Sequence, residues 1–306
     1  MHHKTQAILM ALGAGAATGV GASLVLCASA LDRRLLACSL AFSAGVMIYV
    51  SLADVLAVAN DHFAATLDET AAYALATASL FAGVLIMAFI DWLVHRWFHR
   101  VSAAAKGANP RVQLDEEHSS GSSHGDSDHG SSSIRAVAAV DHRGKLLMMA
   151  TVVSAAIVLH NLPEGMATYA ASFDSVQTGA PLALAIAVHN LPEGLSVAMP
   201  IYHATGSKLR AIGLGALSGM AEPLGAVLAS LVANEHSPEG AFGGLFGLTA
   251  GMMLFVCVAE LLPAAYAERS VPQELIIAAF FFGCAVMATS LVLEKVTSAA
   301  PPPARS

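Results

Sequence analysis

The chain has 306 residues, of which 56% are hydrophobic and only 12% are charged, against about 25% charged residues in a typical soluble domain. This composition excludes a large soluble catalytic domain, because eight membrane helices of about 20 residues each would use nearly all of the apolar residues. The net charge of −7, with no cluster of Lys and Arg among aromatic residues, also argues against a nucleic-acid partner.

Apolar segments long enough to cross a bilayer follow one another along the chain. They lie at 5–30, 35–59, 71–97, 146–172, 178–203, 209–234, 240–266 and 273–296. The first segment is too long for the apolar core of a signal peptide, so it counts as a membrane helix. We therefore predict an all-α membrane protein in which residues 1–306 form a single domain of eight transmembrane helices.

The longest connection, 98–145, combines Ser/Gly runs with acidic residues and four histidines, a composition that predicts disorder. When alternate connections are assigned to alternate sides, one side carries 12 Lys and Arg residues and the other carries 3. The positive-inside rule then predicts a multi-pass protein of the cell membrane, with the 98–145 loop in the cytoplasm and both termini outside. The loop histidines are candidates for loose metal binding, and a solvated linker explains them equally well: His118, His124, His129 and His142.

Two 13-residue segments, 44–56 in the second predicted helix and 250–262 in the seventh, align without gaps. The second helix would run outward and the seventh inward, so the repeat is inverted about an axis in the membrane plane, as is common in transporters. We therefore expect helices one to three and six to eight to form an inverted repeat around helices four and five. Shared small-residue packing is the alternative explanation.

The hexapeptide His-Asn-Leu-Pro-Glu-Gly occurs at 160–165 in the fourth predicted helix and again at 189–194 in the fifth. Its His and Glu are four residues apart, so both side chains project from one helix face. Each copy begins about 11 to 14 residues into its helix, close to the bilayer midplane. Because helices four and five run antiparallel, we expect the two copies to face each other.

Ionisable side chains at this depth cost about 2.5–3.5 kcal/mol each on insertion scales. The carboxylates are Glu164, Glu193 and, on the sixth helix, Glu222. Only two imidazoles, those of His160 and His189, lie in the same motifs, so mutual pairing cannot compensate all of this charge. A divalent cation can, and His nitrogen with carboxylate oxygen suits Zn²⁺ as well as Fe²⁺, Mn²⁺, Co²⁺ and Cd²⁺. A polar cluster that only specifies helix packing is the alternative.

Other residues of the motifs bear on the same question. Each His is followed by an amide, Asn161 or Asn190, which would serve a second metal ion or form a hydrogen bond to a neighbouring helix. Pro163, Pro192 and Pro223 each free a backbone carbonyl. Because such backbone is tolerated in lipid when it is buried in protein or lines an aqueous cavity, the prolines favour a pathway over a sealed core.

These motifs resemble those of the ZIP (Zrt/Irt-like) family of metal-ion transporters, most closely its ZupT/GufA-like subgroup. The resemblance extends to the eight spans, the His-bearing loop and 218–223 in helix six, and it covers the chain apart from the loop. It implies a two-metal centre in which the first ion is held by His160, Glu164 and Glu193. The second ion would be held by Asn161, Asn190, His189 and Glu222, with Glu193 bridging the two ions.

The resemblance also adds two residues of the second predicted helix, Met47 and Asp54. The thioether of Met47 would approach the first metal ion, and Asp54 lies seven residues later on the same helix face. A core methionine and an interfacial acid are the alternatives, with equal weight.

From these features we expect an importer that moves divalent transition metal, with zinc as the first choice, into the cytoplasm by alternating access. The metal would be cargo and not a cofactor, the other partner would be the lipid bilayer, and the sequence leaves a monomer and a homodimer open. It has no G-x-x-x-x-G-K-[ST] loop for ATP, and no enzymatic activity is expected. Two alternatives are an intramembrane zinc hydrolase, for which the H-E-x-x-H signature is missing, and a metal sensor that does not transport.

Overall fold

The computed structural model describes residues 2–28, 32–107, 129–174, 176–232 and 239–298, and every regular element in these ranges is a helix. The elements are α1 (His2–Ser23), the 3-10 turn η1 (Leu24–Cys27), α2 (Arg33–Val50), the π turn η2 (Ser51–Val55), α3 (Leu56–Ala64), α4 (Glu69–Gly107), α6 (His129–Asp174), α7 (Val176–Thr205), α8 (Lys208–Gly219), α9 (Ala221–Val232), α10 (Glu239–Val256), the π turn η3 (Cys257–Leu261), α11 (Leu262–Ala267) and α12 (Gln273–Ser298).

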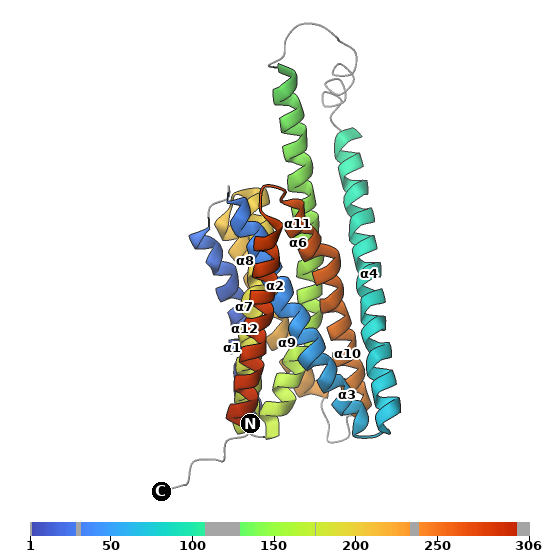
Figure 1. Ribbon diagram of the computed structural model, residues 1–306. Coiled ribbons are helices and arrows are strands. Elements are labelled where there is room, and N and C mark those ends of the chain that lie inside the picture. The colour runs from blue at the N-terminus through green and yellow to red at the C-terminus, as the bar shows by residue number, and fades with distance from the viewer. Residues whose placement is uncertain (1, 29–31, 108–128, 175, 233–238, 299–306) are drawn as a thin grey trace.

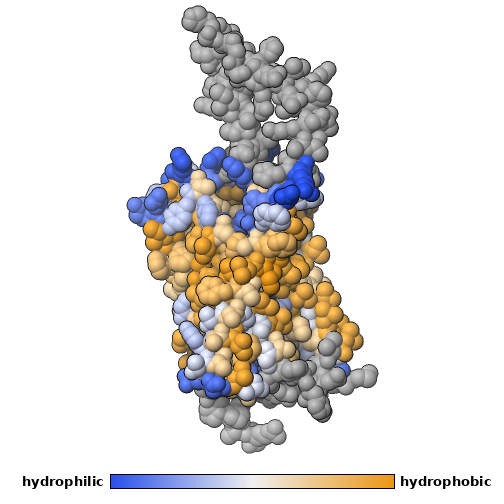
Figure 2. Space-filling view, turned by 90° about the vertical axis from the view of Figure 1, so that its right-hand side faces the viewer, coloured by the Kyte–Doolittle hydropathy of each residue, from blue (hydrophilic) through white to orange (hydrophobic). Residues whose placement is uncertain are grey.

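Eight segments among the described residues are long and apolar enough to cross a membrane. They cover Lys4–Cys27, Arg33–Ala64, Glu69–Trp97, Arg143–Tyr169, Leu182–Thr205, Lys208–Leu231, Gly240–Ala267 and Gln273–Leu293. The helices stand side by side (Figure 1), and Figure 2 shows a broad hydrophobic band between hydrophilic ends. The predicted all-α fold is therefore confirmed, and the chain is a multi-pass membrane protein.

The bundle is arranged around α6 and α7, which pack against each other. Helix α7 also contacts α1, α2 and α8, while α6 contacts α9 and α10. Helices α4 and α12 lie at the periphery, where large apolar side chains such as Leu85 and Phe281 are exposed, as expected for surfaces that face lipid. The two hexapeptide motifs consequently lie in the protein interior.

The last residue of each hexapeptide is a glycine at a point of close helix contact. A Cβ atom at Gly165 would overlap the backbone oxygen of Glu222 in α9, and one at Gly194 would overlap the backbone oxygen of Thr18 in α1. Small residues allow membrane helices to approach this closely. The motif glycines therefore set how closely α9 and α1 approach the His and Glu side chains of the same motifs.

The two copies of the 13-residue repeat have matching local structure. Each contains a five-residue π turn whose fourth residue is an acid, Asp54 in η2 and Glu260 in η3. Each also packs through an equivalent glycine, Gly45 against the backbone of α12 and Gly251 against the backbone of α4. These similarities agree with an internal repeat, while its inversion across the membrane stays a prediction.

The structure differs from the sequence-based expectation in the 98–145 segment. Helix α4 continues to Gly107 and α6 begins at His129, so the flanks of this segment are helical. A membrane helix continues into water without a new nucleation step when the next residues are good helix formers, such as the alanines and lysine at 103–106. Residues 108–128, with His118 and His124, lie outside the described residues.

Candidate metal site at the centre of the helix bundle

The two hexapeptide motifs are paired crosswise between α6 and α7. Nε2 of His160 lies 2.9 Å from Oε1 of Glu193, and Nε2 of His189 lies 3.4 Å from Oε1 of Glu164. The crossing follows from antiparallel packing, since the His of one motif stands at the level of the Glu of the other. All four side chains are at most 4% exposed, so the predicted meeting of the two motifs is confirmed.

Glu222 reaches the same centre from the sixth span. The helix of this span is interrupted at Met220, between α8 and α9. Glu222 therefore lies in the first turn of α9, where the helix dipole favours a carboxylate. Its Oε2 accepts a 2.7 Å hydrogen bond from Nδ2 of Asn190, which also donates to the backbone oxygen of Ala14 at 2.9 Å. In contrast to this break, α6 and α7 continue as helices through Pro163 and Pro192.

The central polar atoms are not satisfied by the protein. Ten buried side-chain N and O atoms of seven predicted ligands have no hydrogen-bond partner among the residues that the structure describes. They belong to His160, Asn161, Glu164, His189, Asn190, Glu193 and Glu222. Leaving such a group unpaired in the interior costs about 1–3 kcal/mol. Most of these atoms are carboxylate, amide or imidazole acceptors, a donor set that suits a divalent cation.

The second span, α2 followed by η2, contributes the remaining predicted residues and one that the sequence did not suggest. Met47 is fully buried in the core, and Asp54 lies close enough to His189 and Glu164 to interact with both electrostatically. Ser43, one turn before Met47, donates a 2.8 Å hydrogen bond to the backbone oxygen of Pro192. This contact fixes α2 against the motif of α7, and no feature of residue type or spacing predicted it.

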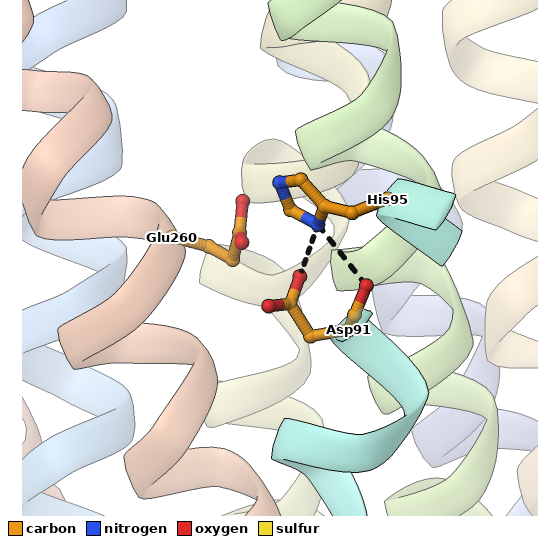
Figure 3. Close-up of side chains that lie close together, drawn as sticks. All are labelled: Asp91, His95 and Glu260. Atoms are coloured by element: carbon orange, nitrogen blue, oxygen red, sulfur yellow. Dashed lines mark hydrogen bonds and ion pairs between the residues drawn. The ribbon is translucent and has the colours of Figure 1, made fainter. Parts of the chain in front are cut away.

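A second group of metal-ligating side chains lies between α4 and η3. Asp91, His95 and Glu260 each offer one ligand atom, and these atoms lie within 4.8 Å of one another. Figure 3 shows Asp91 and His95 projecting from α4 toward Glu260, with Nδ1 of His95 2.8 Å from Oδ1 of Asp91. The Asp-x-x-x-His spacing on one helix face was a sequence signal for this group, which the predicted site did not include.

Eight apolar spans that enclose imidazole, carboxylate and amide side chains define a polytopic helical membrane protein with a set of metal ligands in its interior. The profile of the family described as ZIP Zinc transporter matches residues 76–291. The chain is 37% identical over 289 residues to "Zinc transporter ZupT" of Stenotrophomonas maltophilia (strain K279a), covering 94% of this chain and 96% of that protein.

Two further relatives carry the same name. "Zinc transporter ZupT" of Clostridium perfringens (strain 13 / Type A) is 36% identical over 298 residues, which are 96% of this chain and 97% of the relative. The protein of that name from Oceanobacillus iheyensis (strain DSM 14371) is 35% identical over 297 residues, which are 96% of this chain and 99% of the relative. The chain therefore belongs to the ZIP zinc transporter family, and it is a transport protein and not an enzyme.

Proposed function

We propose that this chain carries divalent transition-metal ions, with zinc as its main cargo, through the centre formed by α6, α7 and α9. The observation that carries the proposal is the crossed His–Glu pairing of two buried motifs whose remaining polar atoms lack partners. The relatives match this chain over nearly their whole length and are named zinc transporters, which supports the same cargo. Fe²⁺, Mn²⁺, Co²⁺ and Cd²⁺ are the alternative cargo ions for this ligand set.

One divalent ion alone does not balance the charges of this centre. A single divalent ion leaves one negative charge on the carboxylates of Glu164, Glu193 and Glu222, and a proton or a second ion must neutralise it. His160, Glu164 and Glu193 would hold the first ion, while Asn161, Asn190, His189 and Glu222 would hold the second, with Glu193 bridging. All seven residues come from one chain, so ion binding at this centre needs no ligand from a second copy.

Metal ions and protons can compete at the His–Glu pairs. An imidazole that donates through Nε2, as His160 can to Glu193, has to lose that proton before the same nitrogen accepts a metal ion. Bound metal and bound protons therefore compete for the same atoms. This competition gives the ion a means of leaving the centre when the carboxylates are protonated.

We infer import into the cytoplasm by alternating access, with helices one to three and six to eight moving against α6 and α7. The direction depends on the predicted orientation, in which the termini are outside and the connection between α4 and α6 is cytoplasmic. Helices α1 and α12 begin and end, respectively, at the end of the bundle opposite to that connection, in agreement with an even number of spans (Figure 1).

The test is zinc uptake into proteoliposomes by the parent protein and by His160→Ala and Glu193→Gln. Each substitution removes one charged or imidazole ligand and disrupts the crossed pair of His160 with Glu193, so we expect uptake to fall by at least about tenfold. Glu268→Gln is the matched control, because Glu268 is also a buried acid but pairs with Arg33 at 3.3 Å, away from the centre. It should keep most of the parent rate.

Zinc uptake at the parental rate in both ligand variants would refute the assignment of this centre as the metal site. Zinc that binds to the purified parent protein without any flux would refute transport and favour a sensor. Orientation is tested separately, by asking whether zinc supplied on the side of the termini enters faster than zinc supplied on the side of residues 108–128.

A further inference from the structure

Helix α6 carries a row of buried polar side chains that begins at the central site and continues toward one end of the bundle. The row consists of His160, Glu164, Thr168 and Ser172, which are spaced four residues apart and are at most 3% exposed. Side chains at this spacing lie on one helix face, with a gradual turn around the axis. We call these four residues the α6 polar row.

The row extends from the centre in only one direction. Four and eight residues before His160, the same face of α6 carries Ala156 and Val152, which are apolar and fully buried. In the other direction Ser172 lies three residues beyond the end of the membrane span at Tyr169. At 1.5 Å per residue, Thr168 and Ser172 cover about 12 Å between Glu164 and the predicted outer surface.

The hydroxyl groups of the row differ from most other hydroxyl groups among the described residues, although Thr18 of α1 also has a buried hydroxyl without a partner. Serines and threonines in membrane helices commonly donate to a carbonyl three or four residues earlier. Thr249 and Ser39 in this structure do so, to Leu245 and Leu36. Oγ1 of Thr168, by contrast, is buried and has no hydrogen-bond partner within the described part of the chain.

Ser172 is the second exception. Its Oγ donates to the thioether of Met10 on α1 at 3.3 Å, and a thioether is a weak acceptor. Its oxygen lone pairs, like those of Thr168, thus remain available to a cation. Four residues along one face therefore offer oxygen or nitrogen atoms in sequence from the surface to the centre.

The outer end of the row is closed in this structure. Ser172 is only 1% exposed, and a Cβ atom at Gly179 of α7 would overlap its side chain. Met10 of α1 covers it from another side. For water to reach the α6 polar row from this end, α6 therefore has to separate from α1 and α7 around Ser172.

We propose that Thr168 and Ser172 line the path by which the metal ion reaches the central site, and that their hydroxyl oxygens replace water on the partly hydrated ion. The inference rests on the proposed transport function and names the outer half of its route. Divalent transition ions accept neutral oxygen ligands in exchange for water, and release them easily enough for passage. Thr168 and Ser172 are thus positioning residues for entering cargo and not permanent ligands.

The test compares the kinetics of zinc uptake with equilibrium zinc binding in Thr168→Val and Ser172→Ala. Loss of one hydroxyl should lower kcat/KM for uptake by about fivefold to tenfold, while zinc affinity of the central site changes by less than about twofold. The matched controls are Thr249→Val and Ser39→Ala, which remove buried hydroxyls that are satisfied within their own helices. Both controls should transport at the parental rate.

A second measurement asks whether water reaches the row. Thr168→Cys should react with a small, charged thiol reagent added on the predicted outer side during turnover, and zinc should slow the reaction. Thr249→Cys should not react beyond the labelling of the parent protein, which has four cysteines of its own.

The two proposals fail in different ways. Parental uptake by both Thr168→Val and Ser172→Ala, together with an unreactive Thr168→Cys, would overturn the outer path. The central site would still stand in that case if Glu193→Gln abolished transport. Parental uptake by Glu193→Gln would overturn the central site itself.

Discussion

Gly165→Ala adds one methyl group at the contact between α6 and α9, and we expect it to disable the transporter. In an unconstrained helix this change would stabilise the protein by about 1 kcal/mol. Here the new Cβ would overlap the backbone oxygen of Glu222, although real Cβ atoms essentially never come within 3.0 Å of a neighbour. The two helices must therefore move apart by about 1 Å, and overpacking of this kind costs about 1–3 kcal/mol. The net effect is a loss of up to about 2 kcal/mol of stability.

The functional effect should exceed the effect on stability, because the displaced segment carries Glu222. A misplacement of about 1 Å can lower a geometrically constrained process on the order of 100-fold. Zinc uptake per reconstituted molecule should consequently fall by at least tenfold, with a lower melting temperature in detergent. Gly213→Ala on α8 is the control, since a Cβ there meets nothing within 4 Å, and it should keep its uptake and gain stability. Equal behaviour of Gly165→Ala and Gly213→Ala would refute the close packing of α6 on α9.

Three further predictions test the charges and ligands separately. Zinc uptake should decrease from about pH 7.5 to about pH 5.5, because protons compete with the metal for imidazole and carboxylate atoms; a flat profile in proteoliposomes would contradict this. Glu260→Gln should raise the melting temperature of metal-free protein, because it removes a carboxylate facing Asp91, and it should reduce the further rise caused by added zinc. Met47→Leu preserves core volume and should change stability by less than about 1.5 kcal/mol. If the thioether contacts the ion, this variant should lose more cadmium uptake than manganese uptake, since sulfur prefers softer ions.

The eight spans were predictable because the membrane imposes a length and a composition on each one. The crossed pairs of His160 with Glu193 and of His189 with Glu164 follow from one motif repeated in two antiparallel helices at similar depth. The sequence carries no comparable signal for the rotation of each helix about its own axis. The bond from Ser43 to the backbone of Pro192 depends on which face α2 turns toward α7, and that orientation is set by packing of the whole bundle.

Disorder in the 98–145 connection was inferred from its overall composition, and its flanks show the limit of that inference. Composition describes whether a segment can bury a core, and this one cannot. Helical structure at the flanks needs no core, since the adjoining membrane helix already provides the nucleus and each added residue gains one backbone hydrogen bond. Local propensity therefore prevails over segment composition next to a membrane helix, as at the end of α4.

The internal repeat predicts where an acid stands but not what compensates its charge. Asp54 and Glu260 occupy equivalent positions, each the fourth residue of a π turn. His189 of α7 and, to a smaller extent, Lys295 of α12 interact electrostatically with Asp54, whereas Glu260 meets Asp91 and His95 of α4. Basic side chains thus face the acid of one half of the repeat, whereas a second carboxylate, that of Asp91, faces the acid of the other. Two halves with the same backbone and different partners cannot respond identically to a metal ion or a proton, so the charges of α4 and α12 should make the two sides of the bundle functionally unequal.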